Sequence, residues 1–427
     1  MGKQNVFVVG LDAFNQALLE QLRGAERLTF RPLLDINSVV HTRDYDIPQL
    51  LQQARGQLDA FPGTIDAIVG YWDFPTSTIL PVLRQQYQLP GPSLESVLRC
   101  EHKYWARLEQ QQVAPQETPA FAPVNPFTGD QQPPPLPFPF WIKPVRAHSS
   151  QLGYRVNTMD DYHHALGCIR DGIHMFAVPF NTLLAKAQLP EEIIRIDGWH
   201  CIAEEIISQG RQCTIEGYML NGEVTIYGVV DSLREGVAHS SFSRYQYPSS
   251  LPQGVQDTMM NDAQRFLQQV GFDNSPFNIE FYYHDDREQL WMLEVNTRCS
   301  KSHSPLFAMV DGASNLQAMV DVALGHPPDF PPQGGPCQVA GKFMLRETQD
   351  ALVERVPTLT EVHRLEANMQ HCLIQIEPLQ GQRLSEMLHQ DSYSYEVATL
   401  FIGGESAEDI EAKAESIKQQ LHFRFSP

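Results

Sequence analysis

Cysteine is scarce in this sequence, and no two cysteines form a close pair. The seven cysteines, from Cys100 to Cys372, include no C-x-x-C pair. A zinc cluster or a disulfide framework needs paired cysteines, so neither is indicated. The pattern is typical of a protein in a reducing compartment.

Basic residues and long apolar runs are also lacking. The chain has 31 Lys and Arg against 51 Asp and Glu, a net charge of −20, which argues against a nucleic-acid backbone or a membrane surface as partner. No run approaches the ~20 apolar residues that cross a bilayer. The apolar run 6–11 lacks a following small-residue cleavage site, so we interpret it as a first strand and not a signal peptide. We therefore expect a cytoplasmic protein.

Two glycine-rich phosphate-binding motifs are absent. Gly10 follows the first predicted strand, but residues 10–15 contain one glycine where the dinucleotide fingerprint needs three. The P-loop pattern G-x-x-x-x-G-K-[ST] does not occur. Neither an NAD site nor a P-loop is predicted.

The length of 427 residues suggests two to four domains. Within residues 5–95, apolar runs of strand type alternate with runs of helical spacing, which predicts an α/β unit with a mostly parallel sheet. Prolines crowd residues 115–139 and 326–336, which predicts extended connections, and a small α+β unit follows the second. In the first unit we expect strands at 6–10, 38–40 and 66–70, and helices at 14–22 and 47–54.

Residues 276–301 form the most informative stretch. Two runs rich in aromatic and β-branched residues, 277–283 and 289–295, flank a polar segment and predict a hairpin. Counting outward from Arg287 at its centre places Glu280 opposite Glu294. The same counting places Asn278 opposite Asn296.

Side chains alternate between the two faces of a strand, so Glu294, Asn296 and Arg298 share one face, which Glu280 joins from the partner strand. Two neighbouring carboxylates in an apolar setting repel each other unless a cation lies between them. Two carboxylates and an amide suit Mg²⁺ or Mn²⁺. The alternative is a surface hairpin with solvated glutamates.

Two lysines precede this hairpin. Lys103 lies in a predicted helix, residues 94–111, with Ser93 as its N-cap, and by itself would be interpreted as a solvated lysine. Lys143 ends an apolar strand, where a phosphate would balance its charge. Small residues follow Lys143 and suit a loop that covers phosphates.

Two further segments are candidates for binding. Residues 201–207 end in Glu204-Glu205-Ile206-Ile207, a strand end that would present backbone groups to a nucleobase, or else an ordinary strand with two solvated acids. Residues 240–248 are polar and aromatic, and we predict an irregular binding loop there. The last helix is expected at 407–421, capped by the acidic segment 405–409.

The order of these parts resembles the ATP-grasp superfamily over roughly residues 5–330. The most specific piece is Glu294-Val295-Asn296-Thr297-Arg298 with Glu280 upstream. The chain looks most like the biotin-carboxylase and L-amino-acid-ligase-like branch, which includes carnosine-synthase-like proteins. The resemblance implies α/β and α+β units in an ATP-grasp fold: a Rossmann-like pre-ATP-grasp domain at 1–95, an ATP-grasp domain at 96–330 with a lid at about 140–203, and a C-terminal α+β domain at 331–427.

The resemblance also implies the roles of single residues. Arg298 would stabilise the acyl phosphate or the transferring phosphoryl group. Lys103 and Lys143 would contact the ATP phosphates, and Ser149, Ser150 and Gly153 would lie in the loop that closes over them. Adenine would be held by Glu204, Glu205 and Ile207. One or two Mg²⁺ ions would be held by Glu280, Glu294 and Asn296.

The implied reaction is phosphorylation of a carboxylate by ATP, followed by attack of an amine on the acyl phosphate. Arg244 and Arg234 are candidates for holding a substrate carboxylate, and Tyr245, Lys301 and His303 for lining the site; a solvated loop or a core role is the alternative. Biotin carboxylases have a glutamate base where this chain has Ser302, which speaks against biotin carboxylation. A carboxylase-like enzyme and a non-catalytic ATP-binding protein stay open as alternatives, as does a homodimer.

Overall fold

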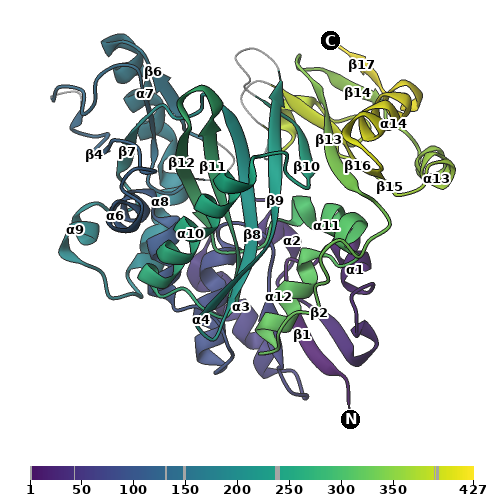
Figure 1. Cartoon of the computed structure of the whole chain (residues 1–427). Coiled ribbons are helices and arrows are strands. Elements are labelled where there is room, and N and C mark those ends of the chain that lie inside the picture. The colour runs from purple at the N-terminus through teal and green to yellow at the C-terminus, as the bar shows by residue number, and fades with distance from the viewer. Residues whose placement is uncertain are drawn as a thin grey trace.

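The computed structural model describes residues 2–42, 44–129, 132–147, 151–235, 241–388, 390 and 394–427. Four sheets organise these residues, and the large central sheet lies above the N-terminal unit in Figure 1. The chain has a mixed α/β fold, as predicted. No helix within the described ranges is long and apolar enough to cross a membrane.

The N-terminal unit is built on a parallel sheet of order β2-β1-β3, which confirms the predicted parallel arrangement. Buried aliphatic side chains on both faces of the sheet pack against helices. Its elements are β1 (Gln4–Val9), α1 (Ala13–Leu19), η1 (Ala25–Arg27), β2 (Leu28–Leu33), α2 (Ile36–Val39), α3 (Ile47–Asp59), β3 (Ala67–Val69) and α4 (Thr76–Gln86).

The strand expected at residues 38–40 is wrong, because this segment lies at the end of the short helix α2. The carboxylate of Asp35 accepts a hydrogen bond from the N–H of Asn37 and caps that helix. The second strand is β2, which contains Arg31 and Pro32 and so lacks the apolar pattern of a buried strand.

The helix predicted at 94–111 begins after Ser93, as expected, but it is broken at His102. Helix α5 (Leu94–Glu101) ends there and α6 (Lys103–Val113) begins. The backbone of His102 is extended, with ψ 99°, and its side chain caps α6 by accepting from the N–H of Trp105. The break places Lys103 at the first position of a helix instead of the middle of one.

A four-stranded antiparallel sheet of order β4-β7-β5-β6 follows. Strand β4 lies inside the segment predicted to have no regular structure, because its backbone pairs with β7, which is distant in sequence. The elements are β4 (Phe121–Val124), β5 (Phe140–Pro144), β6 (Tyr154–Val156), α7 (Met159–Gly172), α8 (His174–Leu184), α9 (Glu191–Arg195) and β7 (Cys201–Glu205).

The large sheet has eight strands in the order β12-β11-β8-β9-β10-β13-β16-β15. The predicted hairpin is confirmed, and Glu280 pairs with Glu294 as counted. A register shift after Glu280 pairs Phe281 with Met292, so the counted register is wrong near the turn. The elements up to residue 323 are β8 (Arg211–Leu220), β9 (Glu223–Glu235), β10 (Ser241–Tyr247), α10 (Gln253–Val270), β11 (Ser275–His284), η4 (Asp285–Arg287), β12 (Gln289–Asn296), η5 (Lys301–His303), α11 (Ser304–Asp311) and α12 (Asn315–Ala323).

The segment predicted as an irregular loop at 240–248 contains strand β10, so that prediction is wrong. Strand β10 is hydrogen-bonded on one side to β9 and on the other to β13. Two neighbouring strands therefore hold it extended, a constraint that its own polar sequence does not reveal.

The C-terminal strands β13, β16 and β15 continue the same sheet beyond the predicted domain boundary at 330, through the pairing of β10 with β13. The last helix is confirmed, and Ser406 caps it by accepting from the N–H of Asp409. The predicted domain limits stay predictions. The elements are β13 (Val339–Glu347), β14 (Leu352–Arg355), α13 (Leu359–Asn368), β15 (Cys372–Ile376), η6 (Leu384–Glu386), β16 (Tyr395–Gly404), α14 (Ala407–Gln420) and β17 (Arg424–Ser426).

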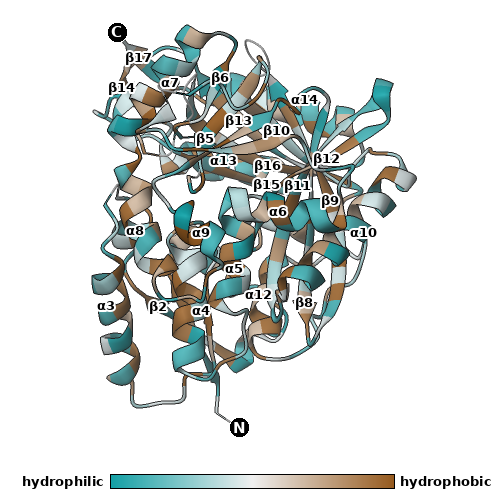
Figure 2. Cartoon of the chain, turned by 90° about the vertical axis from the view of Figure 1, so that its left-hand side faces the viewer, coloured by the Kyte–Doolittle hydropathy of each residue, from teal (hydrophilic) through white to brown (hydrophobic). Residues whose placement is uncertain are grey.

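Helices α3 and α10 are amphipathic, as the alternating hydrophilic and hydrophobic colours along them in Figure 2 show. Helix α10 buries Phe266 and Leu267 against the aromatic face of the hairpin. Phe277, Ile279 and Phe281 form that face and are fully buried. Because alternate residues of β11 enter this core, Glu280 between them is directed to the opposite face.

We expect Phe281→Ala to lower the free energy of unfolding by about 3–5 kcal/mol, because it leaves a cavity under the hairpin. Urea unfolding of the purified variant measures this loss. Phe127→Ala is the matched control, since Phe127 is 49% exposed, and its effect should stay within about 1 kcal/mol. Similar losses of unfolding free energy in the two variants would contradict the conclusion that this core supports the hairpin.

Candidate active site

The hairpin places two carboxylates side by side on the face away from its core. Glu280 and Glu294 are register partners, and the side-chain amide of Asn296 donates to Glu280 Oε1 at 3.4 Å and to Asn278 Oδ1 at 2.9 Å. Burial and the nearby charge of Glu294 raise the pKa of Glu280. A carboxylate whose charged form is disfavoured in this way would gain from a cation.

Lys103 compensates the second carboxylate. Its Nζ donates to Glu294 Oε1 at 2.9 Å and to the carbonyl of Ala147 at 2.9 Å. Burial lowers the pKa of Lys103. Burial alone would raise the pKa of Glu294, but the charges of Lys103 and Lys143 bring it below the ordinary value. Lys103 is therefore not the solvated lysine that its sequence context allows.

Lys143 and Glu204 form a second ion pair on the neighbouring strands β5 and β7. The distance from Lys143 Nζ to Glu204 Oε2 is 2.6 Å, and Arg107 Nε lies 2.7 Å from Glu204 Oε1. The two cations outweigh burial and lower the pKa of Glu204 to about 2. The interpretation of Glu204 as a solvated acid is therefore wrong.

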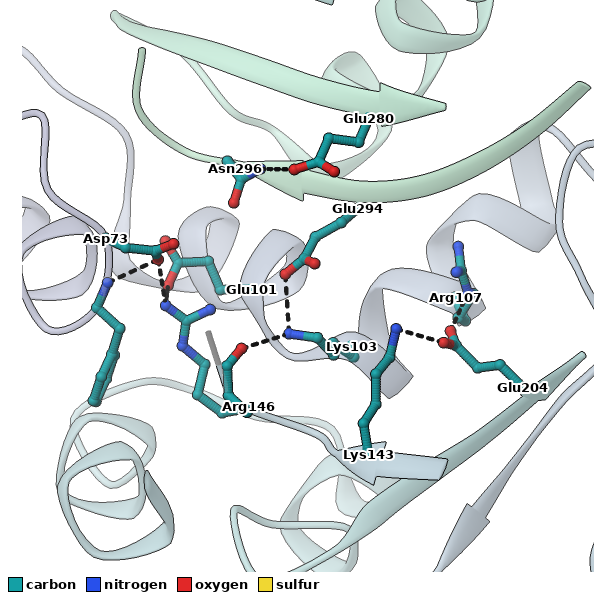
Figure 3. A network of polar contacts seen from close by, with 12 residues as sticks. Asp73, Glu101, Lys103, Arg107, Lys143, Arg146, Glu204, Glu280, Glu294 and Asn296 are labelled. Carbon is teal, nitrogen blue, oxygen red and sulfur yellow. Dashed lines mark hydrogen bonds and ion pairs between the residues drawn. The ribbon is translucent and has the colours of Figure 1, made fainter. Parts of the chain in front are cut away.

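Figure 3 shows how these pairs lie together. Lys143 extends from its strand toward the space next to Lys103, while Glu294 and Glu280 enter that space from the hairpin on the other side. The structure thus gathers four of the predicted site residues, and Asn296, which is hydrogen-bonded to Glu280, lies with them.

The structure gives less support to the other residues that are predicted to bind the nucleotide. Ser149 and Ser150 lie outside the described residues. Gly153 precedes β6 and packs so closely on Trp141 that an added Cβ would lie 3.0 Å from its ring. Glu205 is exposed and ends β7, and Ile207 is buried just beyond it. Their predicted roles in binding phosphate and adenine stay predictions.

Sequence reasoning missed a network of three charged residues, of which Asp73 contacts Arg298 directly. Asp73 Oδ2 accepts from Arg298 Nη2 at 3.2 Å, and its Oδ1 accepts from Arg146 Nη2 at 2.9 Å. Glu101 Oε2 lies 3.1 Å from the same Arg146 nitrogen. Asp73 follows β3 at the carboxyl edge of a parallel sheet, where ligands bind in many α/β folds, and this position was a usable signal.

Arg244 requires a correction. It lies on β10 instead of a loop, and it forms an ion pair with Glu411 of α14. Its guanidinium also lies over the ring of Phe343, 5.6 Å from the centroid. The next residue, Tyr245, points the other way and packs on His303, with ring centroids 5.0 Å apart. Alternation along the strand therefore directs Arg244 away from the face that carries Glu280.

Arg234 approaches the site through one intermediate side chain. Its Nε donates to Gln212 Oε1 at 2.9 Å, and Gln212 Nε2 donates to Glu280 Oε2 at 2.8 Å. His303 contacts buried Glu216, with 2.8 Å between Nδ1 and Oε1, so it has a structural partner.

The donor set fits a hard divalent cation. Within the described parts of the chain, no group of three or more His, Cys, Asp or Glu could hold a metal by itself. Glu280, Glu294 and Asn296 together offer two carboxylates and an amide oxygen. Mg²⁺ typically takes one or two protein carboxylates and completes its shell with water and nucleotide phosphates. An incomplete set of this kind suits a metal that arrives with a nucleotide.

Glu204 also makes the fold sensitive to acid. Its pKa is about 2 in the folded chain against 4.5 ordinarily, so its contribution to stability is complete above pH 4.5 and is lost as the pH falls toward 2. We expect Glu204→Gln to be clearly less stable than the wild type at pH 7, with the difference shrinking through that window. Unfolding curves between pH 2 and 7 test this, with Glu205→Gln at the exposed neighbour as control. A difference independent of pH would contradict the ion pairing.

Comparisons with known proteins agree with this geometry. The family model for the ATP-grasp domain matches residues 136–304. The C-terminal section of the carbamoyl phosphate synthase large chain of Methanopyrus kandleri is 27% identical over 115 residues, which cover 26% of this chain and 21% of that protein. The match thus spans about a fifth of the curated relative.

Solved structures resemble the whole chain. The L-amino acid ligase from Bacillus licheniformis matches with a TM-score of 0.73 and 15% identity, and 100% of each chain is covered. The biotin carboxylase from Campylobacter jejuni matches with a TM-score of 0.65 and 13% identity over 99% of this chain and 92% of that one. Residues 136–304 match an ATP-grasp domain, and the chain as a whole has the ATP-grasp fold.

Proposed function

We propose that this protein is an ATP- and Mg²⁺-dependent ligase that activates a small carboxylic acid or amino acid as an acyl phosphate and joins it to an amine. The observation that carries the proposal is the meeting of Lys103 and Lys143 with the carboxylates of Glu280 and Glu294. The full-length likeness to an L-amino acid ligase supports the choice of reaction.

The two lysines are placed so that they could bind a chain of phosphates. Each is now balanced by a glutamate, Lys103 by Glu294 and Lys143 by Glu204. The phosphates of ATP would offer oxygens to both ammonium groups, and Glu294 would then be available to a metal ion. Bound Mg²⁺ supplies charge neutralisation at the phosphates. Exchanging partners in this way leaves no buried charge uncompensated.

The reaction proceeds in two steps. An oxygen of the substrate carboxylate attacks the γ-phosphorus, and the bond from that phosphorus to the bridging oxygen of ADP breaks. The amine then attacks the acyl carbon, phosphate leaves, and the nitrogen loses a proton. Arg298, which Asp73 orients, is close enough to Glu280 for its charge to lower the pKa of that carboxyl, and it would balance the charge that develops during phosphoryl transfer.

A carboxylase like biotin carboxylase is the second candidate, favoured by the likeness to that fold. Ser302 stands where those enzymes have a glutamate base, and its hydroxyl accepts from Lys342 at 3.5 Å. A hydroxyl is a poor substitute for a carboxylate base near pH 7. Formation of ADP that depends on biotin and bicarbonate would favour this candidate, and ATP binding without turnover would favour a nucleotide-binding protein.

The first test is release of ADP and phosphate from Mg-ATP in the presence of pooled amino acids and small carboxylic acids. We expect release to need two co-substrates and to fall roughly 100-fold or more in Glu294→Gln, which loses a metal carboxylate. Glu288→Gln, an exposed glutamate in the same hairpin, is the matched control. Unchanged release in Glu294→Gln would refute the assignment.

A second test isolates nucleotide binding. Lys143→Met should weaken binding of a non-hydrolysable ATP analogue by about 10-fold or more, because a charge-assisted contact to phosphate is lost. Titration calorimetry with Mg²⁺ measures the affinity, and Lys186→Met, an exposed lysine outside the site, should leave it unchanged. Equal affinities in the two variants would exclude Lys143 from the phosphate site.

A further inference from the structure

The C-terminal strands bring a second group of charged residues to the face of the large sheet that carries Tyr245. Lys342 of β13 lies over the ring of Tyr245, 5.8 Å from the centroid. Glu396 of β16 forms ion pairs with both cations of β13, at 3.6 Å from Lys342 and 3.3 Å from Arg346. The sequence of the C-terminal unit shows no catalytic pattern, and only the continuous sheet places these residues beside the hairpin.

Lys301 faces the same group from the segment after the hairpin. Its Nζ lies 4.4 Å from the ring centroid of Trp72. Within the described ranges, no carboxylate forms a hydrogen bond or ion pair with this half-buried ammonium. The nearby carboxylate of Asp12 is already engaged, since it accepts from the hydroxyl of Tyr71 at 2.9 Å and from the N–H of Asn15 at 2.9 Å.

The charges in this group are unevenly paired. Glu396 forms ion pairs with Lys342 and Arg346, whereas the acids that act on Lys301, namely Glu377, Asp12 and Glu396, form no ion pair with it among the described residues. Burial and the charge of Glu396 raise the pKa of Glu377, so its charged form is disfavoured. Burial and the charge of Lys342 in turn lower the pKa of Lys301. An ammonium group in such a place is costly unless an anion joins it.

The position of Lys301 relates this ammonium group, which has no ion-pair partner among the described residues, to the substrate. Trp72, on which Lys301 lies, directly precedes Asp73, which holds Arg298. Lys342 Nζ contacts the hydroxyl of Ser302, the residue next to Lys301. Through Trp72, Lys301 is thus linked to the segment that orients Arg298, and the far end of a bound acid would lie between Lys301 and Lys342.

We propose that Lys301 and Lys342 bind a second carboxylate of the acid substrate, so that the enzyme selects dicarboxylic acids or acidic amino acids. The indole of Trp72 would pack against the short carbon chain between the two carboxylates. This assignment rests on the proposed ligase function and narrows the class of its acid substrate.

Binding of substrate analogues, measured without turnover, tests the proposal. Glutamate, aspartate and succinate are compared with the amides glutamine, asparagine and succinamate by titration calorimetry, in the presence of Mg²⁺ and a non-hydrolysable ATP analogue. We expect at least one acid to bind the wild type about 10-fold or more tightly than its amide, because an ion pair is lost in the amide.

Lys301→Met should abolish this preference and leave the affinity for the ATP analogue unchanged. Lys418→Met, at an exposed lysine of α14, should retain the preference. Lys342→Met is an independent variant in case the first one unfolds, and Lys301→Arg should restore much of the discrimination. These variants separate charge recognition from a general loss of structure.

Equal binding of acids and amides, no binding of any of the acids, or a preference that survives in Lys301→Met and Lys342→Met would overturn the proposal. Because binding is read directly, absence of ADP release alongside a Lys301-dependent preference would overturn the ligase function and leave the carboxylate site standing. ADP release that is equal with the acids and with their amides would support the ligase function and overturn the carboxylate site.

Discussion

The pairing of Glu280 with Glu294 across the hairpin is the constraint on which the rest of the site depends. Two opposed carboxylates on a partly buried sheet face are unfavourable unless positive charge reaches them. The chain meets this need with Lys103, which comes from a helix far away in sequence. The strand register that brings the two carboxylates together therefore also explains why a lysine is needed beside them.

The position of Lys103 depends on a break between two helices. If residues 94–113 formed one continuous helix, Lys103 would lie in its middle. His102 ends the first helix and caps the second, and its ring Nε2 lies 2.7 Å from the carbonyl of Ile196. The N–H of Lys103 can then bond the carbonyl of Val145, 2.9 Å away, next to strand β5, which carries Lys143. One cap thus brings both lysines to the same space.

The site also joins all parts of the chain. Asp73 from the N-terminal unit orients Arg298, and strands β13, β15 and β16 extend the sheet on which the hairpin lies. Asp73 and Arg298 are separated by 225 positions in the sequence. Their contact forms only when the N-terminal unit lies beside the hairpin.

The sequence by itself determined those features that depend on residues close together in the chain. The hairpin and the pairing of Glu280 with Glu294 follow from alternation around one polar turn, and the caps at Ser93 and Ser406 follow from side chains that bond three residues ahead. These interactions span few residues, so the residue pattern contains them.

Tertiary structure alone decided the rest. Strand β10 exists because β9 and the distant strand β13 hold it on either side, and its alternation turns Arg244 toward α14 and away from the site. The partners of Lys143 and Arg298 were equally hidden, because a charge pattern shows that a counter-charge is needed but does not show which distant residue supplies it. The packing of sheets and helices makes that choice.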